Sequence, residues 1–151
     1  MFGFLGNIDA KIDAKARIFV PASFRKAILS EGQSSLVLRK DVFQNCLVLY
    51  PDKVWQAELD QLKAKLNNWD KMQKQVFRQF VVSAERIEMD SNGRILIPKR
   101  YLQMIGATSD VTFLGMDDTI EIWSKDALDA TLLDTEDFGK QIQDLMNNTN
   151  I

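Results

Sequence analysis

The 151-residue sequence predicts an α+β fold, in which two tandem, pseudo-symmetric β-hairpin repeats form a small barrel-like β core flanked by helical hairpins. One observation is an internal repeat, because residues 14–21 (AKARIFVP) and 91–98 (SNGRILIP) both read as a turn followed by a β-rich strand. Another is the alternation of apolar and polar residues before each turn, and the last is a helical stretch between the two copies.

The repeat extends well beyond these eight residues. At an offset of 77, the matched pairs are Asp13 and Asp90, Arg17 and Arg94, Ile18 and Ile95, Val20 and Ile97, Pro21 and Pro98, Phe24 and Tyr101, and Ile28 and Ile105. Later, CLVLYPDKVW resembles TIEIWSKDAL at an offset of 73. We therefore predict one repeat over 1–80, with its core module at 7–54, and another over 81–151, with its core module at 83–126.

Each repeat is predicted to begin with a hairpin. In the first copy Ile8, Ala10 and Ile12 alternate with polar residues, which is typical of a strand with one packed face. In the second copy Asn92-Gly93 is a strong two-residue turn signal, because both residues tolerate positive φ. Proline cannot donate to a strand ladder and fits the first helical turn, so a proline is expected to end each returning strand.

Helices are expected in three places. A short amphipathic helix is expected after Pro21 and another after Pro98, and Gly106 is predicted to cap the second of these helices. Between the repeats, apolar stripes on both sides of LNNWD (66–70) predict an αα-hairpin. Residues 126–133 and 135–146 are predicted to form a matching C-terminal helical pair. The strings SLVLRK, CLVLYP, VTFLGM and TIEIWS supply the remaining strands.

The composition argues against most enzyme chemistry. The chain has no histidine, which removes Ser-His-Asp and Cys-His nucleophiles and the commonest metal ligand. Its single cysteine, Cys46, lies in the apolar run NCLVLY and is interpreted as a small core residue of a protein from a reducing compartment. We expect no catalytic residue, metal, cofactor or small-molecule substrate, and neither a secretion signal nor a membrane helix.

Charge is distributed unevenly along a chain whose net charge is −2. Residues 1–40 contain seven basic residues against three acidic ones, whereas residues 117–151 contain two basic residues against nine acidic ones. This asymmetry is compatible with ordinary scatter on a solvated surface. The interpretation we favour is a basic end that faces a polyanion and an acidic end kept away from it.

The predicted hairpin tips carry the pattern Asp-x-x-x-Arg, as DAKAR at 13–17 and DSNGR at 90–94. Asp13 and Asp90 would accept backbone N–H bonds and shape the loops, together with Gly93. The arginine of each loop has two possible roles. It could pair with the aspartate in an exposed salt bridge, worth about 0–1 kcal/mol. Alternatively, Arg17 and Arg94 point outward, where a narrow β-ribbon could carry them into a DNA major groove.

Other residues near the tips would support DNA binding. Lys15 and Lys11 would add contacts to phosphates, and Asn92 could either read adenine or shape its turn. One such loop would bind weakly. Duplication, and oligomerisation beyond it, would link several weak contacts into a strong one.

These residues resemble the bacterial MraZ family. The resemblance is carried by MFGF, IDAKARIFVPASFRKAI, CLVLYP, MDSNGRILIP and TIEIW, and it runs from Met1 to about residue 146. The family's hallmark is a pair of Asp-x-x-x-Arg loops, each in a module similar to the AbrB and SpoVT swapped-hairpin DNA-binding domains. The resemblance places the DNA-contacting groups at Lys15, Arg17 and Arg94, and the loop-shaping groups at Asp13 and Asp90.

The resemblance also implies a function. It implies a cytoplasmic, nucleoid-associated homo-oligomeric ring that binds double-stranded DNA at short direct repeats. These repeats would lie upstream of its own operon, in the division and cell-wall gene cluster. One departure is Ala16, where the family usually has glycine, and because alanine disfavours positive φ, the sequence leaves open whether Ala16 alters the turn of the first loop. Ala16 and the acidic C-terminus motivate an alternative, a protein-interaction ring whose DNA binding is weak or lost. An enzyme that uses carboxylates is the least favoured reading.

Overall fold

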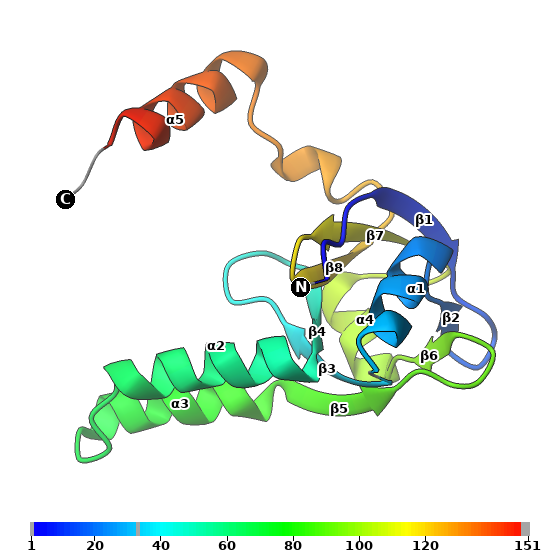
Figure 1. The fold of residues 1–151 in the computed structure, drawn as a ribbon, viewed down its shortest axis with the longest axis horizontal. Helices are drawn as coiled ribbons and strands as arrows, with labels where there is room; N and C mark the ends of the chain where they lie inside the picture. Colours follow the sequence, from blue (N-terminus) through cyan, green and yellow to red (C-terminus); the bar gives the residue numbers. More distant parts are fainter. Residues whose placement is uncertain (1, 33, 149–151) are drawn as a thin grey trace.

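The computed structural model describes residues 2–32 and 34–148. Its strands are β1 (Asn7–Lys11), β2 (Arg17–Phe19), β3 (Ser35–Lys40), β4 (Leu47–Pro51), β5 (Ala84–Glu88), β6 (Arg94–Leu96), β7 (Asp110–Met116) and β8 (Thr119–Ser124). Its helices are α1 (Ala22–Ser30), α2 (Asp52–Lys65), α3 (Lys71–Val82), α4 (Lys99–Ile105) and α5 (Thr135–Asn147), with a 3₁₀ turn at Asp129–Thr131. The predicted α+β class is confirmed (Figure 1). None of the described helices combines the length and the apolar character needed to cross a membrane.

The strands of the two repeats interleave. They form a six-stranded antiparallel sheet in the order β1-β7-β8-β4-β3-β5 and a separate two-stranded ribbon of β2 and β6. Because β1 matches β5, β3 matches β7 and β4 matches β8 in the repeat, this order is symmetric about the β4–β8 pair. The first strand of each repeat therefore pairs with the other repeat, at β1–β7 and at β3–β5.

This exchange contradicts the hairpins predicted for each repeat. The chain does reverse at each loop, but β1 and β2 share only one bridge, between Ile12 and Ile18, and then diverge. The physical reason is burial. Ile18 and Ile95 are buried in the core as cross-strand partners in the β2–β6 ribbon. Each of these short strands therefore pairs with the short strand of the other repeat and not with the strand that precedes it in its own repeat. Within the described residues no ladder joins the edge strands β1 and β5, so the barrel-like closure is not confirmed.

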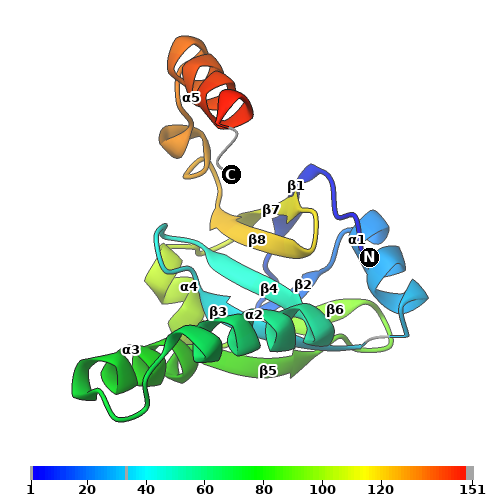
Figure 2. The same ribbon diagram turned by 60° about the vertical axis from the view of Figure 1, so that its left-hand side comes forward.

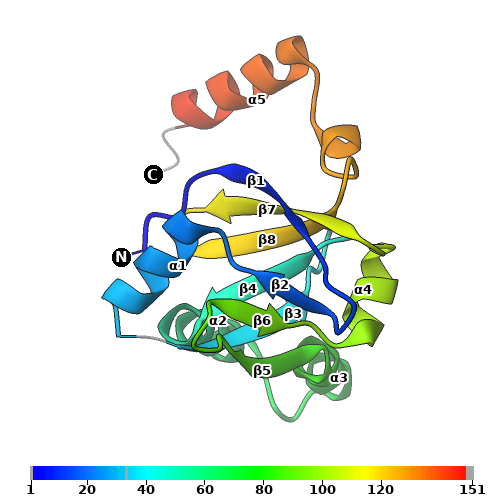
Figure 3. The ribbon, with the colours of Figure 1, turned by 90° about the vertical axis from the view of Figure 1, so that its right-hand side faces the viewer.

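One main core lies between the six-stranded sheet and a layer made of the β2–β6 ribbon, α1 and α4 (Figure 3). Its largest fully buried side chains include Tyr101, Phe24 and Phe113. Pro21 and Pro98 occupy the N-cap positions of α1 and α4, and Gly106 ends α4 in the left-handed conformation, as predicted. The repeat positions with matching apolar residues are therefore the positions that build this layer.

The predicted αα-hairpin is confirmed as α2 and α3, which pack on the other face of the sheet (Figure 2). Trp55 of α2 stacks on Phe80 of α3 at 5.5 Å between ring centroids, and it meets Tyr50 edge-on at 5.4 Å. Beneath them the Arg39 guanidinium, only 3% exposed, lies 4.4 Å from the Phe80 ring centroid. An aromatic cluster around a buried cation thus fixes the helical pair to β3 and β4.

The predicted C-terminal helical pair is wrong in its first half. Residues 126–133 contain only the short 3₁₀ turn, while α5 is a regular helix that stands away from the rest of the chain (Figure 1). Every described residue from 131 to 148 is exposed. Helix formation at 126–133 would leave its apolar residues with nothing to pack against, whereas here Leu128 packs with Cys46 and Trp123. The division of the chain at residue 80 stays a prediction.

Candidate nucleic-acid interface

The first loop (residues 13–17) is held by its aspartate. The Asp13 carboxylate accepts hydrogen bonds from the backbone N–H groups of Lys15 and Arg17, both at 2.9 Å, and from the Arg17 Nε at 2.8 Å. The backbone N–H of Asp13 also donates to the Arg17 carbonyl, and that of Ala16 donates to the Asp13 carbonyl. One carboxylate therefore fixes both the backbone turn and the base of the arginine side chain.

The second loop (residues 90–94) repeats these contacts. The Asp90 carboxylate accepts from the backbone N–H groups of Asn92 and Arg94, both at 2.9 Å, and from the Arg94 Nε at 3.0 Å. Gly93 adopts φ +84° and Ala16 adopts φ +62°, so both loops place a left-handed residue before the arginine. The structure answers the question that the sequence left open: Ala16 does not alter the turn, because the hydrogen bonds to Asp13 hold alanine in the conformation that glycine adopts in the second loop.

The same hydrogen bonds lower the pKa of both aspartates. The pKa of Asp13 lies below its ordinary value of 3.8, chiefly because the backbone N–H of Arg17 stabilises the charged carboxylate. The pKa of Asp90 is lowered in the same way by the backbone N–H of Arg94. Both carboxylates are therefore charged at neutral pH, when the loops take this shape.

The β2–β6 ribbon joins the two loops into one surface. In its register Arg17 lies opposite Leu96 and Phe19 lies opposite Arg94, while Ile18 and Ile95 face the core. Arg17 and Arg94 are therefore diagonal neighbours on the outward face, at a Cα separation of roughly 7–8 Å in ordinary antiparallel geometry. The sequence predicted two separate tips, whereas the strand register places both arginines on one ribbon, and its two strands β2 and β6 lie side by side in Figure 3.

Both arginines keep part of their hydrogen-bonding capacity. Their Nε groups are bound by the aspartates, and the Nη groups of Arg17 and Arg94 donate to no other described residue. Their side chains are 33% and 22% exposed. A guanidinium anchored at Nε and open at both Nη atoms suits bidentate contact with guanine or phosphate.

The other predicted residues lie around the loops. The side chains of Lys15 and Asn92 are exposed at the loop tips, and Asn92 contributes only its backbone N–H to the turn. Lys11 is 87% exposed and lies 3.5 Å from an Asp110 carboxylate oxygen. What these three side chains contact outside the protein stays a prediction.

The sequence reasoning missed three residues on or beside this surface. Phe19 and Leu96, which match at the repeat offset of 77, are 57% and 55% exposed between the arginines. Their position could have been found by applying period-two alternation to RIFVP and RILIP. Arg25 of α1 reaches the second loop from the other repeat and donates to the Val20 carbonyl at 3.0 Å. No feature of the sequence pattern predicts that Arg25 lies against the second loop.

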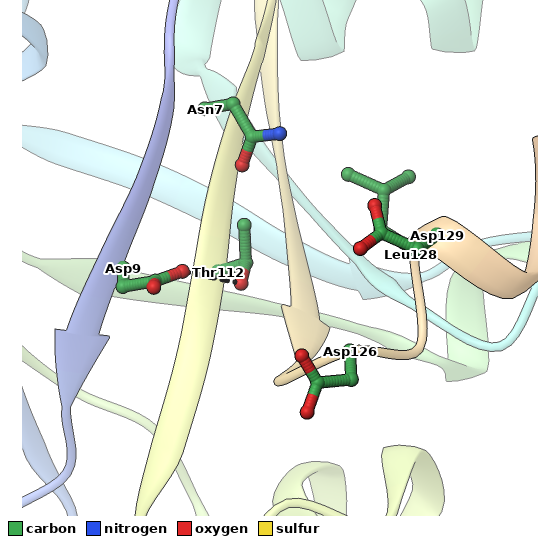
Figure 4. Close-up of a pocket in the computed structure, with 6 residues that line it drawn as sticks. All are labelled: Asn7, Asp9, Thr112, Asp126, Leu128 and Asp129. Atoms are coloured by element: carbon green, nitrogen blue, oxygen red, sulfur yellow. Dashed lines mark hydrogen bonds between the residues drawn. The ribbon is translucent and has the colours of Figure 1, made fainter.

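Other candidate sites in the described residues differ in character. A pocket of about 330 Å³ between β1, β7 and the segment after β8 is lined by Asp9, Asp126 and Asp129 with Asn7, Thr112 and Leu128 (Figure 4). Its acidic lining is unsuited to a polyanion, and Asp9 already accepts a hydrogen bond from Thr112.

Cys46 lies near two carboxylates, Asp41 and Glu121, with the three ligand atoms within 4.8 Å of one another. Burial raises the pKa of the Cys46 thiol to about 12 and keeps it protonated. Asp41 and Glu121 already accept hydrogen bonds, Asp41 from two backbone N–H groups and Glu121 from the Trp123 indole. Cys46 is therefore the core residue that the sequence predicted.

Comparison with known proteins agrees with the sequence resemblance. The family described as "MraZ protein, putative antitoxin-like" matches residues 4–78 and 80–144. A transcriptional regulator MraZ from Phocaeicola vulgatus is 51% identical over 147 residues, covering 97% of this chain and 96% of the relative. Proteins of the same name from Bacteroides fragilis (52% identical, 97% and 92% covered) and Bacteroides thetaiotaomicron (47% identical, 99% and 96% covered) are similar throughout. The chain with the paired Asp-x-x-x-Arg loops therefore belongs to the MraZ family.

Proposed function

We propose that this protein is a sequence-specific DNA-binding transcriptional regulator and not an enzyme. It reads tandem short direct repeats upstream of its own operon, in the division and cell-wall cluster, through the two Asp-x-x-x-Arg loops. The observation that carries the proposal is the shared face of the β2–β6 ribbon. There Arg17 and Arg94, each held at Nε by an aspartate, leave their Nη groups open to a partner. The names of the relatives, transcriptional regulator MraZ, support the same function.

Preorganisation is the physical basis of the proposal. An arginine loses side-chain entropy when it binds, and a carboxylate that already fixes Nε reduces that loss. The exposed Lys15 beside Arg17 adds a non-specific attraction to phosphate. The net charge of −2 does not oppose this, because six of the nine acidic residues of 117–151 lie on α5 or on the segment between β8 and α5, outside the β2–β6 ribbon.

The protein acts as a homo-oligomeric ring in the cytoplasm, associated with the nucleoid. An oligomer is supported by the outward stripe of α5, formed by Phe138, Ile142 and Leu145, which are 57%, 45% and 69% exposed. On α3, Met72 and Val76 are exposed beside Lys71, Lys74 and Arg78, and α3 contains no acidic residue. The segment 134–147 carries four acidic residues and one lysine. Opposite charge and matching apolar surface favour α5 of one copy on α3 of the next.

The test is a gel-shift titration with a fragment of the DNA upstream of the gene, against a scrambled fragment of equal length. Arg17→Ala and Arg94→Ala should each lose binding at least about ten-fold while the oligomer stays intact. Arg17→Lys keeps the charge but lacks the bidentate fork, and it should lose preference for the upstream fragment. Lys15→Ala removes a non-specific phosphate contact and should weaken binding to both fragments alike, whereas its control Lys65→Ala on α2 should bind normally. Equal binding to both fragments by the unmodified protein would overturn the proposal.

A protein-interaction ring without DNA binding is the alternative, favoured by the exposed surface of α5. The structure removes one motive for it, since Ala16 does not alter the first loop. It predicts an intact oligomer with the same affinity for scrambled and upstream DNA.

A further inference from the structure

The outward face of the β2–β6 ribbon is half apolar. Cross-strand pairing places Arg17 beside Leu96 and Phe19 beside Arg94, so each arginine has an apolar neighbour on the adjacent strand. Cross-strand partners hold their Cβ atoms about 4.5–5.5 Å apart. The four side chains therefore form one compact patch, which we call the ribbon patch.

The apolar half of the ribbon patch is exposed. Phe19 is 57% exposed and Leu96 is 55% exposed, whereas Ile18 and Ile95 on the opposite face are buried. A single exposed apolar residue is ordinary on a protein surface. Here two of them occupy equivalent positions of the repeat, and both lie between the arginines that the proposed function assigns to DNA.

Phe19 also contacts the second loop's arginine. The Arg94 Cζ lies 5.8 Å from the centroid of the Phe19 ring, within the range of a cation–π interaction. Leu96 has no ring and offers Arg17 only apolar contact. The Phe19 ring therefore lies near the guanidinium of Arg94 and also remains exposed to solvent.

We propose that Phe19 and Leu96 are specificity-determining residues that contact the C5-methyl groups of thymines in the bound DNA. This inference rests on the proposed function. The major groove is about 12 Å wide and admits a two-stranded ribbon, and the thymine methyl is the one apolar group that a base pair presents there. Two arginines attract and orient the duplex, and the apolar side chains between them select thymine at the neighbouring base pairs.

The experiment uses the full-length protein and two versions of its own upstream DNA. One is amplified with thymidine triphosphate and the other with deoxyuridine triphosphate, which removes only the C5-methyl groups. Affinities are measured by fluorescence anisotropy for the unmodified protein, Phe19→Ala, Phe19→Leu, Leu96→Ala, Phe19→Ala/Leu96→Ala and Arg17→Ala. Leu29→Ala is the matched control, because Leu29 is 54% exposed on α1 and lies outside the ribbon patch.

For the unmodified protein and for Leu29→Ala, uracil DNA should bind about ten-fold more weakly than thymine DNA. Phe19→Ala should bind thymine DNA more weakly and lose most of the difference, and the double variant Phe19→Ala/Leu96→Ala should bind the two DNAs with affinities that agree within about two-fold. Leu96→Ala should lose part of the difference. Phe19→Leu keeps an apolar contact and should retain most of it. Light scattering on each variant checks that the oligomer is unchanged.

The other outcomes separate the two proposals. If the unmodified protein binds both DNAs equally while Arg17→Ala abolishes binding, the thymine contact is refuted and the proposed function stands. If Phe19→Ala keeps the full difference, the methyl groups act elsewhere and the assignment is wrong. If Phe19→Ala changes the oligomer, the ribbon patch is a subunit interface. If the unmodified protein does not prefer its upstream DNA at all, both proposals are refuted.

Discussion

Arg25 of α1 lies directly against Gly93 of the second loop, so that a Cβ added at Gly93 would stand 2.4 Å from the Arg25 Cδ. The first loop differs at both equivalent positions, since Ala16 takes the place of Gly93 and Leu102 that of Arg25. Ala16 and Leu102 belong to the same buried core. In each loop, the size of the left-handed residue therefore fits the helix residue of the other repeat: Gly93 leaves room for Arg25, and the Ala16 methyl group belongs to the same core as Leu102.

This matching predicts unequal changes in stability for two reversed substitutions. Gly93→Ala introduces left-handed strain and displaces Arg25, so it should lower the free energy of unfolding by about 1–3 kcal/mol. Ala16→Gly relieves strain but removes a buried methyl group, so it should change stability by less than about 1 kcal/mol. Urea denaturation measures both. The double variant Gly93→Ala/Arg25→Ala should be less destabilised than the sum of its single changes, and strict additivity would contradict the contact.

The loop aspartates predict a pH dependence of stability. The pKa values of Asp13 and Asp90 in the folded protein lie below the ordinary value of 3.8. The charged carboxylates therefore stabilise the folded state fully when the pH is well above 3.8. This stabilisation is lost as the pH falls through the lowered values. The free energy of unfolding of the unmodified protein should therefore fall more steeply in acid than that of Asp13→Asn/Asp90→Asn. Parallel pH curves for the two proteins would show that the carboxylates contribute nothing.

Helix α5 predicts a selective loss of assembly. Ile142→Asp places a charge in the apolar stripe of α5 and should convert the proposed oligomer to smaller species, without lowering the stability of the subunit core. Gln143→Asp adds the same charge away from the stripe and should leave the oligomer unchanged. Size-exclusion chromatography with light scattering distinguishes them. An intact oligomer for Ile142→Asp would mean that subunits meet elsewhere.

We expect the buried Arg39 side chain to stabilise the protein more through its packing than through its charge. Its guanidinium donates to the Tyr50 hydroxyl at 2.5 Å and lies over the Phe80 ring, while its Nε has no hydrogen-bond partner among the described residues. Arg39→Ala should cost about 2–4 kcal/mol, because it opens a cavity beneath the helical pair. Arg39→Met keeps the length and the contact with Phe80, so it should recover at least half of that loss. Thermal unfolding of both variants provides the comparison.

The sequence was sufficient for most of the local structure. Alternation located the strands, and the prolines and Gly106 marked helix ends, because these signals depend on neighbouring residues. The partners of the strands could not be predicted. The alternation of apolar and polar residues predicts which face of β2 is buried. It does not predict whether Ile18 pairs within its own repeat or with Ile95 of the other repeat.

The candidate site was predicted in composition but not in arrangement. Asp13, Arg17 and their counterparts were found because the repeated pattern requires no tertiary information. The joining of both arginines on one ribbon, and the place of Phe19 between them, depend on the exchange of strands. The turn at Ala16 could not be predicted for a different reason. Positive φ disfavours alanine on average, and three hydrogen bonds to Asp13 outweigh that preference here.

The exchange of strands also has a consequence for biosynthesis. Translation releases the N-terminal half first, and β1 then has no partner, since Asn7 pairs with Leu114 in a strand that the ribosome has not yet made. The nascent chain must hold β1 and β2 unpaired until the second half emerges, and pairing across so long a separation is slow. Mature subunits should therefore form only after synthesis is complete, and a product terminated before residue 110 should lack the strand that pairs with β1.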